Sequence, residues 1–169
     1  VNEFSQFARL PTAELAPNNL NEIVKEALFL FQEGHRGINF QFQRGELPSL
    51  ELDRDQIKRA LINLLDNAVA AVEEKGEIKI STAYNPVSGI VHLEVADDGC
   101  GLASEVRARI FEPYLSTKKD GTGLGLAIVS AIVADHRGYI RVRPNDPKGT
   151  RFIIELPVRD QADLQEMKR

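Results

Sequence analysis

The chain has 169 residues, enough for one domain with a substantial core, and its 43% hydrophobic and 27% charged residues are typical of a globular protein. The net charge of −4 argues against a large nucleic-acid footprint, so we expect no nucleic acid among its partners. Cys100 is the only cysteine, which excludes an internal disulfide and fits a reducing compartment. No apolar run is long enough to span a bilayer and no signal peptide is evident, so we expect no membrane contact by this segment.

The spacing of apolar residues predicts helices and strands that are interleaved along the chain. The opening VNEFSQFARLP has the pattern of a helix end that Pro11 stops, which indicates a piece of a longer protein. Asn19 and Asp53 stand where the N-caps of the two longer helices are expected. In chain order, the expected elements are a linker over 11–19, a helix over 20–33, strands over 38–43 and 50–52, a helix over 53–75, strands over 77–84 and 90–97, a short helix over 105–110, a helix over 124–135, and strands over 138–144 and 149–157.

Most of the predicted strands follow one another through turns instead of alternating strictly with helices. This order argues against a doubly wound parallel sheet. It favours a mixed sheet with helices packed on one face. The fold class that we expect is therefore a two-layer α/β sandwich.

The segment that starts at Gly121 reads GTGLGLAIV and places three glycines directly before a predicted apolar helix. It is not a P-loop, because no Gly-Lys-Ser/Thr follows, and it lacks the third glycine and the preceding strand of the dinucleotide fingerprint. The N–H groups of Gly121, Gly123 and Gly125 nevertheless lie at a helix start, where the helix dipole favours an anion. Taken alone, the segment fits a phosphate contact or an ordinary glycine-rich turn.

Two asparagines lie along the edge of the apolar face of the helix predicted over 53–75. Asn63 and Asn67 are one turn apart in that helix. One interpretation is that both are solvated, as polar residues on a helix usually are. The other is a metal site, because an Asn carbonyl oxygen is a neutral, hard ligand that suits Mg²⁺ and adds no negative charge beside a triphosphate.

Asp97 ends the strand predicted over 90–97, and Gly99 and Gly101 follow it in the sequence VADDGCGL. A carboxylate with glycines beside it can accept a hydrogen bond from the 6-amino group of adenine. Guanine presents a carbonyl oxygen at that position, so the same contact selects ATP over GTP partly by repulsion. The alternative interpretation is an ordinary Asp-Asp-Gly turn.

Five motifs occur in order and with the spacing of one domain: NLLDNA, DDGCGL, FEPYLSTK, GTGLGLAIV and KGTRFIIELP. Together they resemble the ATP-binding catalytic domain of bacterial sensor histidine kinases, which belongs to the GHKL superfamily and has the Bergerat fold. The resemblance covers residues 18–157 and is best to the nitrogen-regulation kinases of the membrane-anchored NtrY type. It implies an α/β two-layer sandwich with a mixed, mainly antiparallel sheet of about five strands and three main helices on one face.

The resemblance also implies a division of the chain. Residues 1–11 would be the end of the dimerisation and phosphoacceptor helix, 12–19 a linker, 20–157 the ATP-binding catalytic domain, and 158–169 a polar C-terminal tail. This segment would be cytoplasmic, and the parent protein would be anchored in the inner membrane. Its partners would be ATP, the dimerisation domain of the same kinase and a response regulator.

For the site, the resemblance implies that Asn67 binds Mg²⁺ and that Asn63 helps to hold the metal and the phosphates. Lys118 would act beside the phosphates with these two asparagines as the catalytic set. Thr150 would support Asp97 from a neighbouring strand through a water molecule, and Phe111 would anchor a lid over ATP. The full set of implied nucleotide-binding residues is Asn63, Asn67, Asp97, Gly99, Gly101, Phe111, Thr117, Lys118, Gly121, Thr122, Gly123, Leu124, Gly125 and Thr150.

The position of Asn63 separates kinases from hydrolases in this superfamily. The related ATPases carry a glutamate there as a general base for water, and such a base contributes about 10²- to 10⁴-fold in rate. Because Asn63 offers no ionisable base, we expect a kinase that donates the γ-phosphate of Mg·ATP to a histidine. An ATP-hydrolysing module and a degenerate nucleotide-sensing or protein-interaction domain stay open as alternatives.

The histidine that accepts the phosphate is expected to lie outside this chain. The chain has three histidines, His35, His92 and His136. None of them stands in the His-Glu/Asp setting that a phosphoacceptor helix has in the family. We therefore expect that this segment binds Mg·ATP but does not phosphorylate itself alone.

Overall fold

A five-stranded mixed sheet is the frame of the domain in the computed structural model, which describes residues 11–115, 124–159, 166 and 169. In spatial order its strands are β2 (Ile38–Gln43), β4 (Gly76–Asn85), β5 (Ile90–Asp97), β7 (Thr150–Pro157) and β6 (Tyr139–Pro144). Only the pair β2–β4 is parallel, and the other three pairs are antiparallel. The expected mixed, mainly antiparallel sheet is therefore confirmed.

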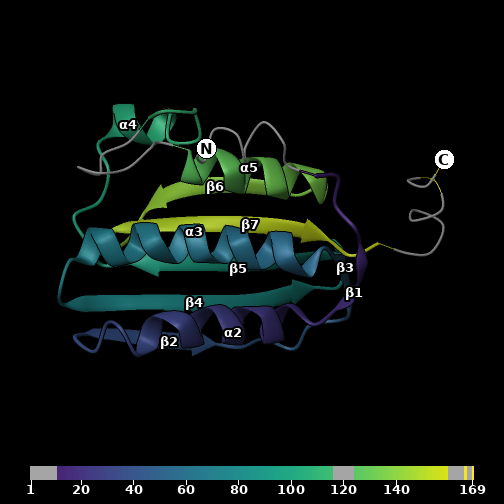
Figure 1. Cartoon of the computed structure of the whole chain (residues 1–169), viewed down its shortest axis with the longest axis horizontal. Helices are drawn as coiled ribbons and strands as arrows, with labels where there is room; N and C mark the ends of the chain where they lie inside the picture. The colour runs from purple at the N-terminus through teal and green to yellow at the C-terminus, as the bar shows by residue number, and fades with distance from the viewer. Residues whose placement is uncertain (1–10, 116–123, 160–165, 167–168) are drawn as a thin grey trace.

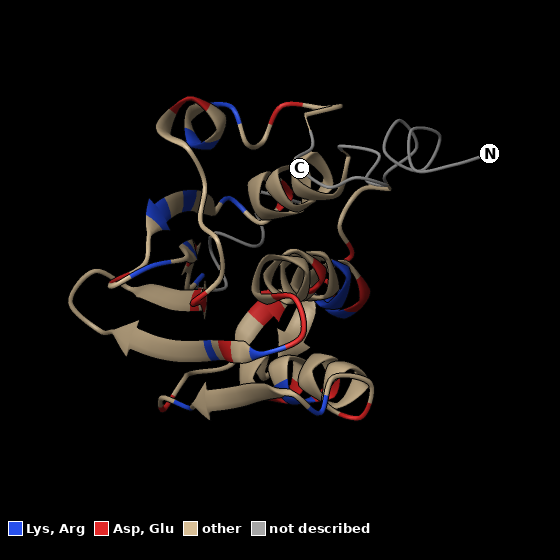
Figure 2. Ribbon diagram, turned by 90° about the vertical axis from the view of Figure 1, so that its left-hand side faces the viewer, with Lys and Arg blue, Asp and Glu red and all other residues tan. Residues whose placement is uncertain are grey.

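Three helices cover one face of this sheet: α2 (Leu20–Gln32), α3 (Arg54–Val72) and α5 (Gly125–Asp135) (Figure 1). The view turned by 90° shows the helices as one layer beside the strands (Figure 2). Alternate residues of the central strands are buried beneath them, such as Val91, Leu93 and Val95 of β5. This arrangement is the predicted two-layer α/β sandwich.

The short helix α4 (Ser104–Ala108) follows β5, close to the predicted range 105–110. Among the described residues, no helix is both long enough and apolar enough to cross a bilayer.

Helix α3 begins where the sequence predicted and ends earlier. Its N-cap Asp53 accepts a hydrogen bond from the N–H of Gln56 at 3.1 Å through Oδ1. The prediction that it continues to residue 75 is wrong, because Glu73 takes a φ of 62° and breaks the helical conformation. The earlier end leaves Gly76 free to begin β4.

Part of the predicted linker is a strand. Ala16–Asn18 form β1, which pairs antiparallel with β3 (Leu50–Leu52) in a separate two-stranded sheet. The expected strand 50–52 is thus confirmed, although it does not join the main sheet. This pairing holds the segment that enters the domain in place, directly beside the N-terminal end of α3.

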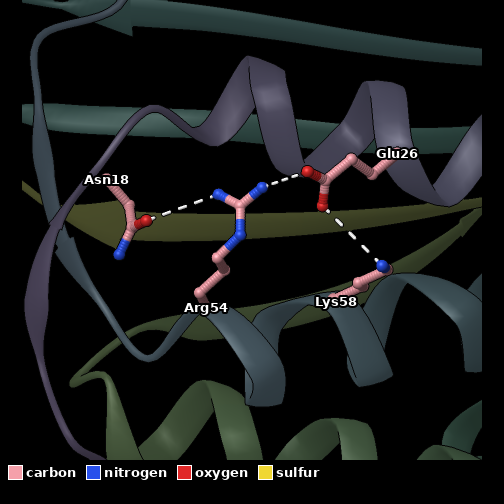
Figure 3. A network of polar contacts seen from close by, with 4 residues as sticks. All are labelled: Asn18, Glu26, Arg54 and Lys58. Atoms are coloured by element: carbon pink, nitrogen blue, oxygen red, sulfur yellow. Dashed lines mark hydrogen bonds and ion pairs between the residues drawn. The ribbon is translucent and has the colours of Figure 1, made fainter.

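A polar network reinforces this junction (Figure 3). Arg54 of α3 is paired with Glu26 of α2 and lies 3.5 Å from the Oδ1 atom of Asn18 in β1. Lys58, one turn further along α3, lies 3.7 Å from the second carboxylate oxygen of Glu26. Because all three charged side chains are partly exposed, we assign the network a role in orientation and only a small contribution to stability.

His136 makes a second connection to the start of α3. It is the C-cap of α5 and is 2% exposed, so it is a buried structural residue. Its Nδ1 lies 2.7 Å from the carbonyl oxygen of Ile132, and its Nε2 accepts the N–H of Asp53 at 3.0 Å. These partners require the neutral ring with the proton on Nδ1.

The neutral state of His136 has a consequence for stability. Burial lowers the pKa of His136 below its ordinary value, against smaller opposing effects that include its hydrogen bond to Ile132. The unfolded chain therefore binds this proton at a higher pH than the folded domain does. The contribution of His136 to stability is complete above its ordinary pKa of about 6.5 and is lost as the pH falls through the lowered folded value.

We predict that this contribution can be isolated with His136→Gln, which keeps an acceptor near the N–H of Asp53 but cannot be protonated. The free energy of unfolding of the wild type minus that of the variant should be larger at pH 7.5 than at pH 5.5, by no more than about 1.4 kcal/mol, the limit that the unfolded pKa sets. Urea unfolding of both proteins at each pH measures it. A difference that stays constant between these pH values would contradict the assigned protonation state.

Candidate functional site

The centre of the candidate site is the side chain of Asp97, the last residue of β5. It is 4% exposed, although it is an acidic residue. Its Oδ1 accepts the N–H of Gly99 at 2.9 Å, and the backbone N–H of Thr150 is a second donor to the carboxyl group. The antiparallel register places Thr150 directly opposite Asp97. Support of Asp97 by Thr150 through a water molecule stays a prediction.

The electrostatic state of Asp97 follows from these surroundings. Burial raises the pKa of its carboxyl group, and the hydrogen bonds from Gly99 and Thr150 oppose this change. The nearby charge of Asp98 raises the pKa slightly further. A buried carboxylate of this kind is stabilised by each additional donor, such as an amino group of a ligand.

The turn after Asp97 packs against the end of α3. A Cβ atom on Gly99 would lie 2.5 Å from the carbonyl group of Ala71, so only glycine allows this approach. The N–H of Cys100 also donates to the carbonyl oxygen of Ala71 at 3.2 Å. Gly101 completes the turn with a φ of 76°. Because Ala71 is one helical turn beyond Asn67, the turn brings Asp97 and Asn67 to the same region.

The turn between β6 and β7 closes on Asp97 from the other side. Gly149 has a φ of 107°, and a Cβ atom there would overlap the carbonyl oxygen of Asp97. Asn145 donates a hydrogen bond from Nδ2 to the same carbonyl oxygen at 2.8 Å. Sequence reasoning missed Asn145, and its only local signal was a place in a turn before Asp-Pro. These contacts fix the backbone of Asp97 while its carboxyl group is held by Gly99 and Thr150.

The two asparagines lie half-buried on α3. Asn63 donates from Nδ2 to the carbonyl oxygen of Gly125 at 3.3 Å, which ties α3 to the first residue of α5. Asn63 therefore has one partner in the protein, and its role as a metal or phosphate ligand stays a prediction. Asp66, which lies between them in the sequence, is exposed.

The remaining predicted residues fall into two groups. Phe111 is half-buried and packs edge-to-face on Phe152 of β7, with ring centroids 6.2 Å apart. Leu124 is buried as the N-cap residue of α5, where its apolar side chain leaves the first turn without a side-chain cap. The other predicted residues lie outside the described part of the chain: Thr117, Lys118, Gly121, Thr122 and Gly123.

The arrangement offers two different chemistries at its two ends. Asp97 supplies a buried acceptor at one end. At the other end, Asn67 supplies an amide oxygen beside the start of α5, where the nearest described atom to a Cβ on Gly125 would be Cγ of Asn63 at 3.9 Å. Neutral amide oxygens and a helix start suit a divalent cation together with phosphates. The described residues therefore fit a Mg²⁺-nucleotide whose base lies at Asp97.

Comparison with known families agrees with this geometry. A family model described as "Histidine kinase-, DNA gyrase B-, and HSP90-like ATPase" matches residues 52–160, well over half of the chain. The chain belongs to this ATPase family. Its members are ATP-binding domains, so the expected resemblance and the expected nucleotide class are confirmed.

Sensor histidine kinases are among the relatives of this ATPase domain. It is 35% identical over 172 residues to nitrogen regulation protein NtrY of Azorhizobium caulinodans, a match over 98% of this chain and 22% of that protein. It is 33% identical over 167 residues to signal transduction histidine-protein kinase AtoS of Escherichia coli, over 96% of this chain and 27% of that protein. The chain thus spans about a quarter of the length of these relatives.

Solved structures of histidine kinases share the fold. The catalytic domain of histidine kinase ThkA in a nucleotide-free form has a TM-score of 0.78 and 37% identity, over 86% of this chain and 96% of that one. Full-length ShkA in complex with AMPPNP has a TM-score of 0.82 and 33% identity, over 93% and 35% of the two chains. ThkA in complex with response regulator protein TrrA has a TM-score of 0.80 and 34% identity, over 93% and 46%.

We predict that the ATPase domain tolerates alanine poorly at Gly149 and better at Gly89. Both residues have positive φ values, but a Cβ on Gly89 meets nothing within 4 Å, whereas on Gly149 it overlaps Asp97. Gly89→Ala should therefore cost about 1 kcal/mol of unfolding free energy from backbone strain alone. Gly149→Ala should cost at least about 2 kcal/mol. Equal costs in chemical denaturation would contradict the described packing of this turn.

Proposed function

We propose that this domain binds Mg·ATP and donates the γ-phosphate to a histidine on the dimerisation domain of its parent kinase, for relay to a response regulator. The observation that carries the proposal is the buried carboxylate of Asp97, held by Gly99 and Thr150 on the same side of the sheet as the asparagines of α3. Its family and the names of its relatives support the same activity.

In this proposal Asp97 recognises adenine. Its carboxyl group already receives two backbone N–H groups, and the 6-amino group of adenine would be a further donor to the ionised form. Gly99 and Gly101 keep the adjacent space free of side chains. Phe111, which packs on Phe152, would anchor the lid on the phosphate side.

Asn67 would hold Mg²⁺, and Asn63 would support both the metal and the phosphates. Bound Mg²⁺ would neutralise phosphate charge during the transfer. Asn63 already contacts the start of α5, so it lies between the metal ligand and the helix that receives the phosphates. Further phosphate contacts are proposed from the resemblance alone, at Thr117, Lys118, Gly121, Thr122, Gly123, Leu124 and Gly125.

The amide at position 63 favours a kinase over a hydrolase. General-base activation of water needs an ionisable group at this position, and Asn63 has none. Bound ATP would therefore not be hydrolysed before a protein acceptor binds. The hydrolase remains the second candidate only because the family also includes gyrase- and HSP90-like ATPases.

The proposed partners are the dimerisation domain, which would include residues 1–11, and a response regulator. A structure of ThkA in complex with response regulator protein TrrA supports the second partner. We propose a cytoplasmic site of action on a parent protein anchored in the inner membrane. A role in nitrogen regulation follows only from NtrY, since AtoS is nearly as similar to this chain.

We predict that Asp97→Asn weakens the binding of ATP at least about tenfold, because an amide lacks the charge that strengthens the bond to adenine. Asp98→Asn is the matched control. Its Oδ1 atom, which accepts the N–H of Glu77 at 2.8 Å, persists in asparagine, so its affinity should stay within about twofold of the wild type. Calorimetric titration measures both. Equal affinities of the wild type and Asp97→Asn would count against adenine recognition by Asp97.

Incubation with γ-labelled ATP and Mg²⁺ tests the reaction itself. We predict no label on this chain alone, and acid-labile label on the dimerisation domain of the parent kinase when that domain is supplied in trans. Steady release of labelled phosphate without a phosphoprotein, lost in Asp97→Asn, would instead identify the hydrolase. Strong acid-labile label on this chain would show that it contains its own acceptor.

A further inference from the structure

Helices α3 and α5 lie side by side (Figure 1). Two hydrogen bonds, here called ties, join them at different positions along their length. In the middle of α3, Asn63 donates to the carbonyl oxygen of Gly125, the first residue of α5. At the N-cap of α3, the N–H of Asp53 donates to Nε2 of His136, the C-cap of α5. The first half of α3 therefore runs antiparallel to α5 and is tied to it at both ends.

The spacing of the two ties is matched on the two helices. The tied residues are 10 positions apart on α3, from 53 to 63, and 11 positions apart on α5, from 125 to 136. At a rise of 1.5 Å per residue these separations are about 15 Å and about 16 Å. A slip of one helical turn, about 5.4 Å, would break both hydrogen bonds, so the two ties together select one axial register.

Asp53 is a rigid anchor for the His136 tie. Its Oδ1 caps α3 through the N–H of Gln56, and its Oδ2 accepts the N–H of Glu14 at 2.9 Å. Gln56 in turn donates to the carbonyl oxygen of Pro11 at 2.8 Å. The entering chain, the cap of α3 and the end of α5 thus meet at one residue.

We propose that His136 is a positioning residue for the phosphate side of the nucleotide site. His136 lies at the far end of α5 from Gly125, so it acts only by fixing the register of α5 against α3. That register sets where the first turn of α5 stands relative to Asn63 and Asn67. The proposal rests on the function proposed above, because it assumes that these residues hold the phosphates and the metal.

The adenine side of the site does not depend on this tie. Asp97 is held by Gly99 and Thr150, and its backbone is held by Asn145, none of which belongs to α5. The Gly99 turn contacts α3 at Ala71, in its last turn, at the opposite end of the helix from the tied N-cap. Losing the tie of His136 should therefore affect phosphate binding and leave recognition of the base intact. The loss of a residue with a merely structural role would instead weaken the binding of the base and the binding of the phosphates alike.

The test compares adenosine, titrated by NMR, with Mg·AMPPNP, titrated by calorimetry, on four proteins. His136→Phe fills the space of the ring without an acceptor for Asp53. In His136→Asn the side chain reaches the carbonyl oxygen of Ile132 but not Asp53, so the tie is also lost. This variant replaces His136→Phe in the test if His136→Phe does not fold. His136→Gln restores an acceptor at the distance of Nε2. Leu28→Ala, which truncates a buried residue of α2, is the control for general destabilisation.

We expect Mg·AMPPNP to bind at least fivefold more weakly to His136→Phe or His136→Asn, with adenosine affinity within twofold of the wild type. His136→Gln should regain Mg·AMPPNP affinity to within about twofold. Leu28→Ala should change the affinity for neither Mg·AMPPNP nor adenosine. Unchanged Mg·AMPPNP affinity in a folded Phe or Asn variant, or equal losses for both ligands, would overturn the proposal. If the wild type binds neither ligand, the proposed function itself fails.

Discussion

The site depends on one constraint: a carboxylate must be kept buried and correctly aimed at the end of β5. The side chain of Asp97 has almost no contact with solvent, which is costly for an acid unless donors surround it. The register of β5 against β7 supplies the N–H of Thr150, and the turn at Gly99 supplies another. A shift of one residue in that register would turn the side chain to the opposite face of the sheet. In the proposed function, strand pairing thus sets the position of the group that recognises the base.

Helix α3 connects this carboxylate to the rest of the site. Its last turn receives the glycine turn that follows Asp97, through the carbonyl group of Ala71. Its middle carries Asn67 and Asn63, and its N-cap is fixed by the entering chain, by α2 and by α5. One helix therefore positions the proposed base-binding end, the proposed metal-binding end and the junction with the preceding segment.

The features that the sequence predicted are those with local causes. The layers follow from apolar periodicity, and the caps at Asn19 and Asp53 follow from side chains that bond to N–H groups two or three residues away. Asp97 was identifiable because a strand end and a glycine turn stand next to each other in the chain. Asn63 and Asn67 were identifiable as a pair because they are one helical turn apart.

The features that the sequence did not predict depend on residues far apart in the chain. The strand β1 exists only because it pairs with β3, which lies 34 residues away at the hydrogen bond from Asn18 to Leu52. The tie between Asp53 and His136 spans 83 residues, and the contact of Asn145 with Asp97 spans 48. No periodicity or motif encodes such contacts. The early end of α3 has a different cause, since Glu73 adopts a conformation that few non-glycine residues take.

We propose that Asp97 accepts a hydrogen bond from the 6-amino group of adenine. The most direct measurement is the affinity of the wild-type domain for ATP and for purine riboside triphosphate, in which a hydrogen atom replaces that amino group. We expect the analogue to bind at least about tenfold more weakly with Mg²⁺ present, because a bond to a charged acceptor is lost. Equal affinities for the two nucleotides would contradict it.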